Sequence, residues 1–517
     1  MHRLVKAIAD ASPKFNTFLL VDYPRQSIEA IPADIDRAWR YGLKMIDPSL
    51  KYVSYEVVRP HERARIEMDG KTGRTIAGSV SEVLLVKYRF THTNKDTHES
   101  RDYNSFFYTP FMKDRTLVIR GKRMAVVLGV TEQVFSRLPE KSGDGVMIRP
   151  IRAPVKFGRR ETIRISAVGD PYKFHEFILI GYLYSKSTGK RALETTVLLY
   201  LNSKFGFNAT VERLGLNVED FTFVPDLNKA ELGTHYFFPA SKTSKSGTVD
   251  VFLRVRKQAM SKQIARKFVA NLLYTLQSFD LHSVSDLMDP QGTVYRVMLG
   301  KILNPSYGEM QALNSANSHI ASIDMLLDPI TKERFQKFIP EIGENIYDVL
   351  YYVFIHIDQI MVNNLPQDLY SKRIDAASGI FVEAYAKPIY HRLYHAFQKT
   401  TLRAKEVVAM LRTRPMAIDA AINAQRGDAA RNINSAPTIS NDSWLASCGI
   451  AKHRPDGSPK LRFDPSMAVV ESVNVFSGNK VGNTGGINPM LQIDKDGRIL
   501  HPDYCREIDA LSPYLPR

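Results

Sequence analysis

The amino-acid sequence predicts an α+β fold in several domains. Its 517 residues correspond to about three domains at roughly 150 residues each. Runs of β-branched and aromatic residues occur in the first part of the chain. Apolar residues at a helical spacing dominate the middle, and short strand and turn patterns follow residue 436. A hydrophobic content of 44% is sufficient for packed cores, which excludes a disordered or coiled-coil protein.

Strands are predicted between residues 51 and 135. The runs that predict them are residues 52–58, 83–90 and 117–119. The turn signals Asp69-Gly70 and Arg120-Gly121 separate such runs, as is typical of hairpins. A further apolar run, residues 177–183, fits either a strand or a helix.

Amphipathic helices are predicted in the middle of the chain. Between Ser261 and Phe279, the apolar residues Ile264, Phe268, Leu272 and Leu276 recur every four residues. Lys262, Arg266 and Lys267 fall elsewhere on the helical wheel, which predicts a polar side. A second helix is predicted at residues 346–361, and a third after Gly379, with Ile389, Leu393 and Phe397 at the same spacing.

The net charge of +16 favours a polyanionic partner, and nucleic acid is the first candidate. A group of basic residues lies close to Phe157 and ahead of Tyr172. Its members are Arg149, Arg152, Lys156, Arg159, Arg160 and Arg164. Cations with aromatic rings nearby are typical of nucleic-acid surfaces, but a solvated basic face fits the pattern equally well.

Other motifs favour structural interpretations. His391 and His395 lie four residues apart, but no Glu follows His391 as in a zinc-protease helix, so a structural or surface pair is expected. Asp494, Asp496 and Gly497 resemble the start of a calcium loop. Because no Glu stands at the twelfth position, a hairpin turn is expected there.

Phosphate, redox and membrane functions find little support in the sequence. The Gly-rich segment 478–486 lacks a Gly-Lys-Ser/Thr ending, so a P-loop is not expected, and a flexible loop near nucleic acid stays open. Cys448 and Cys505 cannot build a disulfide framework, which favours a reducing compartment. The most apolar stretch, residues 348–362, is interrupted by polar residues, so no membrane segment is expected.

Several segments, in chain order, resemble the N-terminal half of the β subunit of multisubunit DNA-dependent RNA polymerases. Residues 50–55 and 86–89 are similar to early strands of that family, and residues 110–127 to its next hairpin. The strongest match is residues 368–377, which are similar to the segment before a long helix. Gly485-Gly486, His501-Pro502, Tyr504-Cys505-Arg506 and Ser512-Pro513 resemble the fork region.

The resemblance implies a protrusion, a lobe and a fork. Residues 1–150 are expected to form the first part of a protrusion-like domain, and residues 151–370 a lobe-like insertion. Residues 371–435 are expected as the helical return of the protrusion. Residues 436–517 are expected as a fork-like region continued by a separate polypeptide. The arrangement is similar to the split β subunits of giant (jumbo) bacteriophages.

By the same resemblance, this chain carries no catalytic residue and binds no metal or cofactor itself. The family holds two Mg²⁺ ions mainly on an Asp triad of β′, whose Asp-Phe-Asp-Gly-Asp motif is absent from this sequence. Mg²⁺ is therefore expected on a partner subunit. The residues expected to bind nucleic acid, in the fork-like loops, are Asn479, Lys480, Asn483, Arg498 and Pro513.

The expected function is that of an N-terminal β fragment in a phage DNA-directed RNA polymerase, a nucleotidyltransferase that transcribes phage genes. Its expected partners are a C-terminal β fragment, β′ fragments, a promoter-specificity subunit as a further candidate, the DNA template and the RNA product, with no membrane. The expected location is the infected host cell, in the cytoplasm or a phage compartment, with the virion as an alternative.

Two other classes of protein compete with this prediction. The alternative is a basic DNA-coating or packaging protein without catalysis, which the charge alone also permits. A stand-alone nuclease would need clustered metal-binding carboxylates, which the sequence patterns do not indicate.

Overall fold

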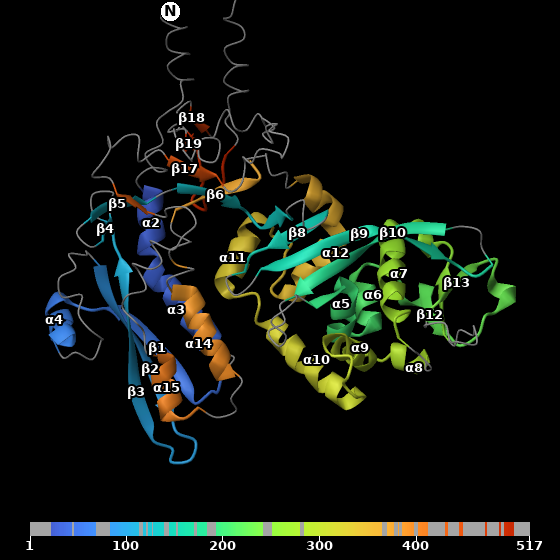
Figure 1. Cartoon of the computed structure of the whole chain (residues 1–517), viewed down its shortest axis with the longest axis horizontal. Helices are drawn as coiled ribbons and strands as arrows, with labels where there is room; N and C mark the ends of the chain where they lie inside the picture. Colours follow the sequence, from blue (N-terminus) through green and yellow to red (C-terminus); the bar gives the residue numbers. More distant parts are fainter. Residues whose placement is uncertain are drawn as a thin grey trace, which may run out of the picture. The chain divides into compact units, whose positions relative to one another are not determined.

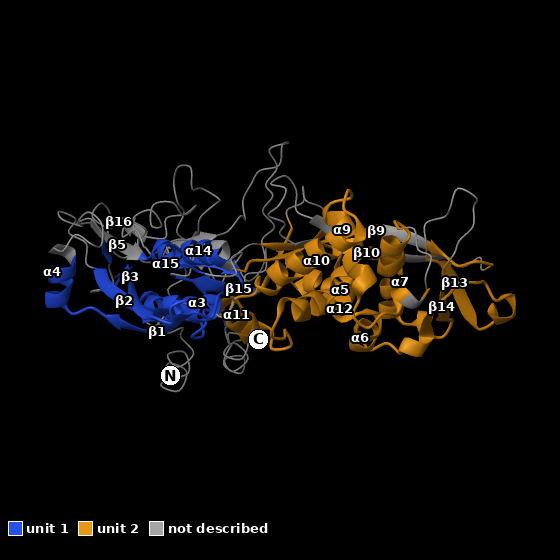
Figure 2. Cartoon of the chain, turned by 90° about the horizontal axis from the view of Figure 1, so that it is seen from below, with its two compact units in different colours: residues 1–133, 365–517 blue, residues 134–364 orange. Residues whose placement is uncertain are grey.

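The computed structural model divides the chain into two compact units. Unit 1 comprises Met1–Gln133 and Leu365–Arg517, and unit 2 comprises Val134–Asn364 (Figure 2). The structure describes residues 22–43, 46–68, 83–112, 117–119, 122–126, 128–138, 144–150, 154–169, 173–183, 193–240, 251–279, 284–363, 370–376, 381, 385–397, 402–411, 430–432, 444–447, 471–472, 485–487 and 491–500. Helices and sheets occur in both units, which confirms the predicted α+β class.

A three-stranded antiparallel sheet forms much of unit 1 (Figure 1). Its strands, in order, are β1 (Leu50–Val57), β2 (Val83–Thr93) and β3 (Ser100–Pro110). The predicted strands at 52–58 and 83–90 are therefore confirmed. Tyr88 and Phe90 alternate with exposed or half-buried residues along β2, because successive side chains point to opposite faces.

Helix α3 (Ile31–Leu43), from the N-terminal part of unit 1, packs on this sheet. Helix α2 (Tyr23–Glu29) precedes α3 and contacts it, and α4 (Pro60–Met68) follows β1. The Trp39 ring of α3 meets Phe90 edge to face, with ring centroids 5.1 Å apart. The buried Tyr88 hydroxyl donates to the carbonyl oxygen of Pro32 at 3.0 Å, which satisfies a polar group inside an otherwise apolar core.

Residues after unit 2 complete the same core. Helix α14 (Lys387–Phe397) confirms the third predicted helix, and α15 (Ala404–Leu411) packs on β3. The Ser105 hydroxyl donates to the Leu411 carbonyl at 2.7 Å. The Asp47 carboxylate accepts the Leu402 amide at 3.1 Å, and His92 lies 3.1 Å from the Leu402 carbonyl oxygen. Buried hydrogen bonds thus join the two parts of unit 1.

Two further sheets belong to unit 1. Strands β4 (Leu117–Ile119), β5 (Lys122–Val126) and β16 (Ala430–Asn432) form one of them, with β5 in the centre. Ile119 stands opposite Lys122, which agrees with the hairpin predicted there. The other sheet is five-stranded and is described with the candidate site.

Unit 2 contains a five-stranded antiparallel sheet and a three-stranded sheet. The first has the order β11 (Leu193–Thr196), β10 (Lys173–Leu183), β9 (Val155–Ser166), β8 (Asp144–Ile148) and β7 (Phe135–Arg137). The second has the order β12 (Phe221–Val224), β14 (Phe252–Arg256) and β13 (His235–Pro239). The ambiguous run at 177–183 is a strand, because β10 pairs with β9 and β11 on its two sides.

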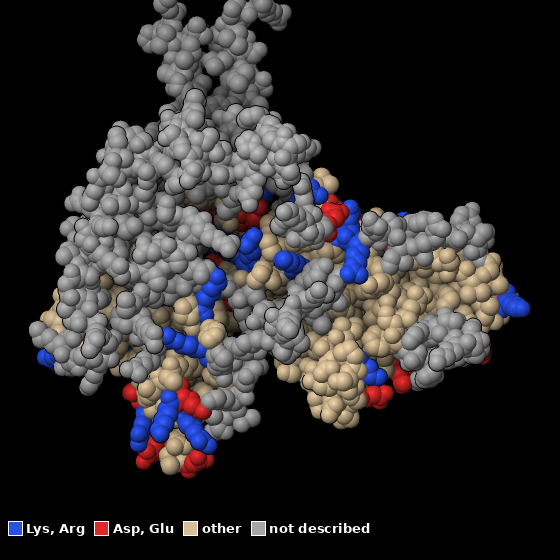
Figure 3. Space-filling view, in the orientation of Figure 1, with Lys and Arg blue, Asp and Glu red and all other residues tan. Residues whose placement is uncertain are grey.

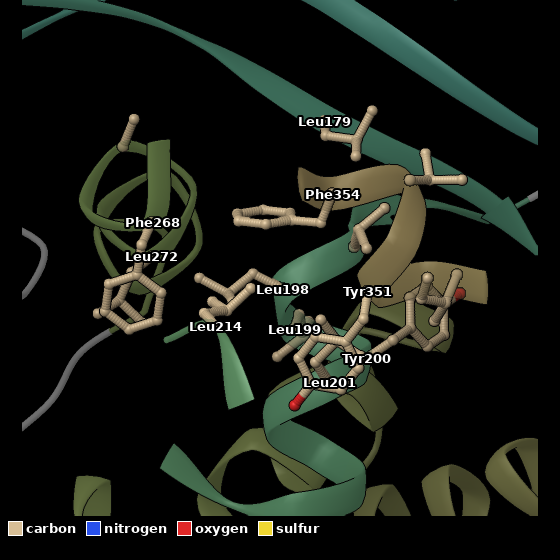
Figure 4. Close-up of a cluster of buried hydrophobic side chains, with 14 of the residues drawn as sticks. Leu179, Leu198, Leu199, Tyr200, Leu201, Leu214, Phe268, Leu272, Tyr351 and Phe354 are labelled. Atoms are coloured by element: carbon tan, nitrogen blue, oxygen red, sulfur yellow. The ribbon is translucent and has the colours of Figure 1, made fainter. Parts of the chain in front are cut away.

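Helices supply much of the core of unit 2. They are α5 (Val197–Phe205), α6 (Phe207–Arg213), α7 (Gln263–Leu276), α8 (Val284–Leu287), α9 (Thr293–Leu303), α10 (Glu309–Asp324), α11 (Pro329–Phe338) and α12 (Ile346–Asn363). The predicted helices at 261–279 and 346–361 are confirmed by α7 and α12. Figure 4 shows Phe268, Phe354, Leu179 and Leu198 meeting in this core.

The boundaries of the two units can be compared with those of the predicted domains. Unit 2 interrupts unit 1 at residues 134–364, and the sequence places its lobe-like insertion at 151–370. The identification of these parts as protrusion, lobe and fork stays a prediction. No helix in the described part of the chain has the length and apolar character needed to cross a membrane.

Candidate nucleic-acid interface

A five-stranded sheet in unit 1 brings together segments that are far apart in the sequence. Its order is β15 (Lys372–Asp375), β6 (Leu128–Glu132), β17 (Trp444–Ser447), β19 (Gly485–Ile487) and β18 (Glu471–Ser472). Strand β15 lies inside the 368–377 segment, and β19 contains the Gly485-Gly486 pair. Two of the segments singled out by sequence therefore share one sheet.

A buried cation holds β15 against β6. Lys372 is only 4% exposed, and its Nζ lies 2.5 Å from Oε2 of Glu132, opposite it in the strand pair. Gln133 donates to the backbone carbonyl oxygens of Tyr370 and Lys372 at 3.2 and 3.0 Å. Because a buried charge needs a partner close by, Lys372 has a structural role in this sheet.

A tight turn at Asp494–Arg498 lies against β15. The Asp494 carboxylate accepts the amides of Asp496 and Arg498 at 2.9 and 2.8 Å, and the Asp494 amide donates to the Arg498 carbonyl at 3.0 Å. Ile493 and Ile499 pair across the turn. The predicted hairpin turn is confirmed, since the Asp494 carboxylate caps backbone amides as in an Asx turn.

Glycine is required at position 497 of this turn. Gly497 has φ +81°, in the left-handed region, and its carbonyl accepts the Ile374 amide at 2.7 Å. The Tyr23 hydroxyl donates to the Ile374 carbonyl at 2.8 Å. A Cβ at position 497 would lie less than 3 Å from both the Ile374 carbonyl oxygen and the Tyr23 hydroxyl. The three groups form a clamp, which we call the Tyr23–Ile374–Gly497 clamp.

The charges around the clamp nearly balance one another. Arg373 and Arg498 stand opposite each other in a β-bridge, and like charges in such positions repel. Asp375 lies 3.4 Å from Nη1 of Arg373, and Asp494 lies 4.0 Å from Nε of Arg498. Burial, together with the nearby carboxylate of Asp375, raises the pKa of Tyr23, so its hydroxyl stays a hydrogen-bond donor.

Of the residues predicted to bind nucleic acid, Arg498 is the one that the structure describes. Its side chain is 42% exposed, so the guanidinium reaches solvent while its backbone is held by the turn. Asn479, Lys480, Asn483 and Pro513 lie outside the described residues. The roles of all five in binding nucleic acid stay predictions.

The basic group in unit 2 differs from its expected arrangement. Phe157 is fully buried in the core, so the expectation that its ring accompanies the cations at the surface is wrong. The alternation of Val155, Lys156 and Phe157 along β9 explains this, because every second side chain points into the core. Arg159 bridges two carboxylates, at 2.6 Å from Asp144 and 2.9 Å from Asp358. The structure does not describe the side chains of Arg152, Arg164 and Tyr172.

Sequence reasoning missed an exposed aromatic beside one of these cations. Tyr274 on α7 is 38% exposed, and Nη1 of Arg160 donates to its hydroxyl oxygen at 3.1 Å. Its position on the helix gave a signal, since Tyr274 lies two residues from Leu272 and therefore on the opposite side of α7 from the buried stripe. A ring and a guanidinium together at a surface can stack on bases and neutralise phosphate.

The prediction that Lys267 lies on a polar side of α7 is wrong. It is 2% exposed, and its Nζ lies 3.2 Å from the Phe354 carbonyl oxygen, 3.7 Å from Asp358 and 4.6 Å from the centre of the Phe177 ring. Burial lowers the pKa of Lys267, whereas Asp358 opposes that shift. The helix is buried on more than one side because it packs against β10 and α5 and meets the Phe354 carbonyl of α12, and the sequence pattern of α7 alone does not show these neighbours.

On the face shown in Figure 3, the described Lys and Arg side chains form several separate groups, some of them beside Asp or Glu. Among the described residues, no group of three or more His, Cys, Asp or Glu side chains could hold a metal ion. His391 is exposed, and the side chain of His395 is outside the described part. The surfaces that remain as candidates for nucleic-acid contact are the Asp494–Arg498 turn and the Arg160–Tyr274 pair.

Comparison with known families gives a match over most of the chain. A family model described as "Non-virion RNA polymerase subunit" matches residues 5–400, which is more than half of the chain. No curated protein matches the sequence. The matched range includes all of unit 2 together with strands β1–β6 and β15 of unit 1.

Proposed function

Since the chain belongs to the family of non-virion RNA polymerase subunits, we propose that it is the N-terminal part of the β subunit of a phage DNA-directed RNA polymerase. It is thus a subunit of an enzyme that synthesises RNA. Our finer proposal is that it helps to form the DNA cleft and the wall of the active centre, and that separate polypeptides supply the remainder of β and β′. The family description favours the infected cell over the virion as the place of action.

The observation that carries the β-subunit proposal is the shared sheet of β15, β6 and β19. The 368–377 segment and the Gly485-Gly486 pair resemble separate motifs of β, and these motifs are hydrogen-bonded into one sheet here. Chance matches in an unrelated protein would have no reason to meet in space. The family match also favours a polymerase subunit over the DNA-coating protein that the charge alone permitted.

The Mg²⁺ ions of such an enzyme are expected on a partner subunit. In this chain, one oxygen of Asp494 already accepts two backbone amides, so this carboxylate is arranged to hold a turn. By the resemblance to β, we assign to this chain the binding and positioning of nucleic acid, and the chemical step to a partner subunit.

The proposed contacts with nucleic acid use two different kinds of surface. Arg498, with the loop residues Asn479, Lys480, Asn483 and Pro513, would lie near the template or the RNA. The Arg160–Tyr274 pair would stack on unpaired bases. Both would contribute to affinity through phosphates and base faces without reading sequence, as transcription of many templates requires.

The proposal is tested by purifying the tagged chain from infected cells. Mass spectrometry should identify stoichiometric partners, one of them with an Asp-Phe-Asp-Gly-Asp motif, and the eluate should incorporate nucleotides into RNA only with Mg²⁺ and a DNA template. A chain that elutes alone, bound to DNA and inactive, would support the coating protein instead.

Charge-reversing variants test the residues. Lys480→Glu and Arg498→Glu should slow elongation more than they reduce subunit recovery. Lys229→Glu, an exposed Lys of unit 2, is the control with the same change in charge. Equal loss of assembly and elongation for Lys480→Glu would contradict its role at the nucleic acid.

A further inference from the structure

Strand β1 is an edge strand with several exposed apolar side chains. Val53, Tyr55 and Val57 are 50%, 37% and 49% exposed. Isolated apolar residues at a surface are ordinary, but three at alternating positions of one strand form a continuous apolar border. This border, Val53, Tyr55 and Val57, is called the β1 edge below.

The β1 edge has a backbone that can accept another strand. In the described part of the chain, β1 pairs with β2 on one side and with no strand on the other. The pairing with β2 shifts between Tyr52 and Ser54, so Val53 lies in a bulge and the regular edge runs from Ser54 to Val57. Exposed edges with unpaired backbone groups are ready templates for strand addition.

The side chains of the β1 edge continue the buried face of the sheet. Tyr55 stands opposite Tyr88 and stacks on it, with ring centroids 5.6 Å apart, and Val57 stands opposite the buried Val86. A strand added beside β1 would place its own apolar side chains against Tyr55 and Val57. Such an addition would extend the core of the sheet by one strand and bury the exposed border.

The surroundings of the β1 edge are positively charged. Residues 51–65 contain four Lys or Arg and two Glu, and Lys51, Arg59 and Arg65 are exposed. Oε1 of Glu56 lies 3.0 Å from Nζ of Lys87, so part of the negative charge of Glu56 is already neutralised. An incoming strand that alternates apolar residues with carboxylates matches both the apolar border and this charge.

We propose that the β1 edge binds an extended segment of another subunit of the polymerase, with alternating apolar and acidic residues, by strand addition. Main-chain hydrogen bonds supply affinity in this mode of recognition, and alternate side chains supply specificity. The identification of the partner as a polymerase subunit rests on the proposed function. The geometry of the edge does not depend on that identification.

Photo-crosslinking in the assembled enzyme tests the proposal directly. The photoreactive residue p-benzoyl-phenylalanine is placed at Tyr55, and the irradiated complex is digested and sequenced by mass spectrometry. An adduct with an apolar, acidic segment of another subunit is expected. Adducts with nucleic acid, with this same chain or with a second copy of it would overturn the proposal, as would the absence of any adduct.

A variant pair gives a second measurement that does not depend on crosslinking. The double substitution of Val53→Lys and Val57→Lys should weaken retention of one partner subunit at least tenfold relative to the wild-type chain. This difference in retention should grow as the salt concentration rises. Val408→Lys on α15 is the matched control, because Val408 is also 50% exposed and lies in the same unit. Equal retention in the double variant and the control would overturn the proposal.

The two proposals fail in different ways. If the wild-type chain recovers partners and makes RNA while the double variant assembles normally, the β1 edge proposal is wrong and the proposed function stands. If the wild-type chain recovers no partners, the proposed function is wrong. A circular-dichroism spectrum of the double variant checks that it folds as the wild type does.

Discussion

Replacing Gly497 with alanine should open the Asp494–Arg498 turn by breaking the Tyr23–Ile374–Gly497 clamp. An alanine in the left-handed conformation costs about 1–2 kcal/mol by itself. Its Cβ would also displace the Ile374 carbonyl and the Tyr23 hydroxyl, and with them two hydrogen bonds of 2.7 and 2.8 Å. At about 1 kcal/mol for each bond, the total cost is about 3–4 kcal/mol.

Hydrogen exchange of the full chain measures this cost locally. A change of about 1.4 kcal/mol is tenfold in an equilibrium constant, so the amide of Ile374 should exchange roughly 100- to 1,000-fold faster in Gly497→Ala. Gly215→Ala is the matched control. Gly215 has φ +71°, but a Cβ there would meet nothing within 4 Å, so only the conformational cost applies.

In the control, the amide of Leu216, which donates to Val211 at 3.1 Å, should exchange roughly 5- to 30-fold faster, the equivalent of about 1–2 kcal/mol. Tyr23→Phe retains the glycine and removes one hydrogen bond, so an increase of about fivefold at Ile374 is expected. If Gly497→Ala accelerates exchange no more than Gly215→Ala does, steric closure of the clamp is refuted.

Three further predictions concern other parts of the chain. Burial opposes ionisation of Asp47, but hydrogen bonds from Ser49, Lys95 and Leu402 lower its pKa from 3.8 to about 2. Thermal unfolding of unit 1 should therefore show stability lost as the pH falls from 3.8 through 2, and Asp47→Asn should flatten this dependence. Burial lowers the pKa of His319 from 6.5 to about 4, so the unfolded state binds more protons between these values. Unit 2 should lose about 3 kcal/mol as the pH falls from 7 to 4, measured by urea unfolding followed by exchange in unit 2, and His319→Gln should remove most of this loss. Tyr274→Ala should weaken binding of single-stranded nucleic acid by about 1–3 kcal/mol, or roughly 5- to 150-fold in a fluorescence titration, whereas Tyr274→Phe retains the stacking surface.

Each of these predictions has an opposing result. A pH profile of Asp47→Asn that parallels the wild type would show that another carboxylate governs the acid transition. Wild-type stability of unit 2 that is constant between pH 7 and pH 4 would mean that His319 is protonated in the folded state. Equal affinities for Tyr274→Ala and Tyr274→Phe would show that the Tyr274 ring does not contact the nucleic acid.

Local pattern was enough to predict much of the fold. The strands at 52–58 and 83–90 follow from runs of β-branched and aromatic residues. The stripe of Phe268, Leu272 and Leu276 follows from a spacing of four residues. Both signals depend only on neighbours along the chain. The Asp494 turn was predictable for the same reason, since a carboxylate that caps amides two and four residues later is a local event.

Features that depend on contacts between distant segments could not be predicted from the sequence patterns. Lys267 is buried because the Phe354 carbonyl oxygen and Asp358 arrive from a helix more than 80 residues later. The pairing of Arg160 with Tyr274 joins residues 114 positions apart. The family resemblance indicated which segments belong to the candidate site, but the clamp that joins Tyr23 to Gly497 has no signature in either segment.

The pairing of β6 with β15 has a consequence for synthesis of the protein. Glu132 and Lys372 are neighbours in the sheet but 240 residues apart in the chain. At about 5–20 residues per second, β6 leaves the ribosome roughly 10–50 s before its partner strand. Unit 2 lies wholly between them and can fold in that interval, which would bring the ends of the insertion closer and reduce the entropy of closing the loop. Until then β6 has an exposed edge, so the nascent chain is most vulnerable to mispairing while unit 2 is being made.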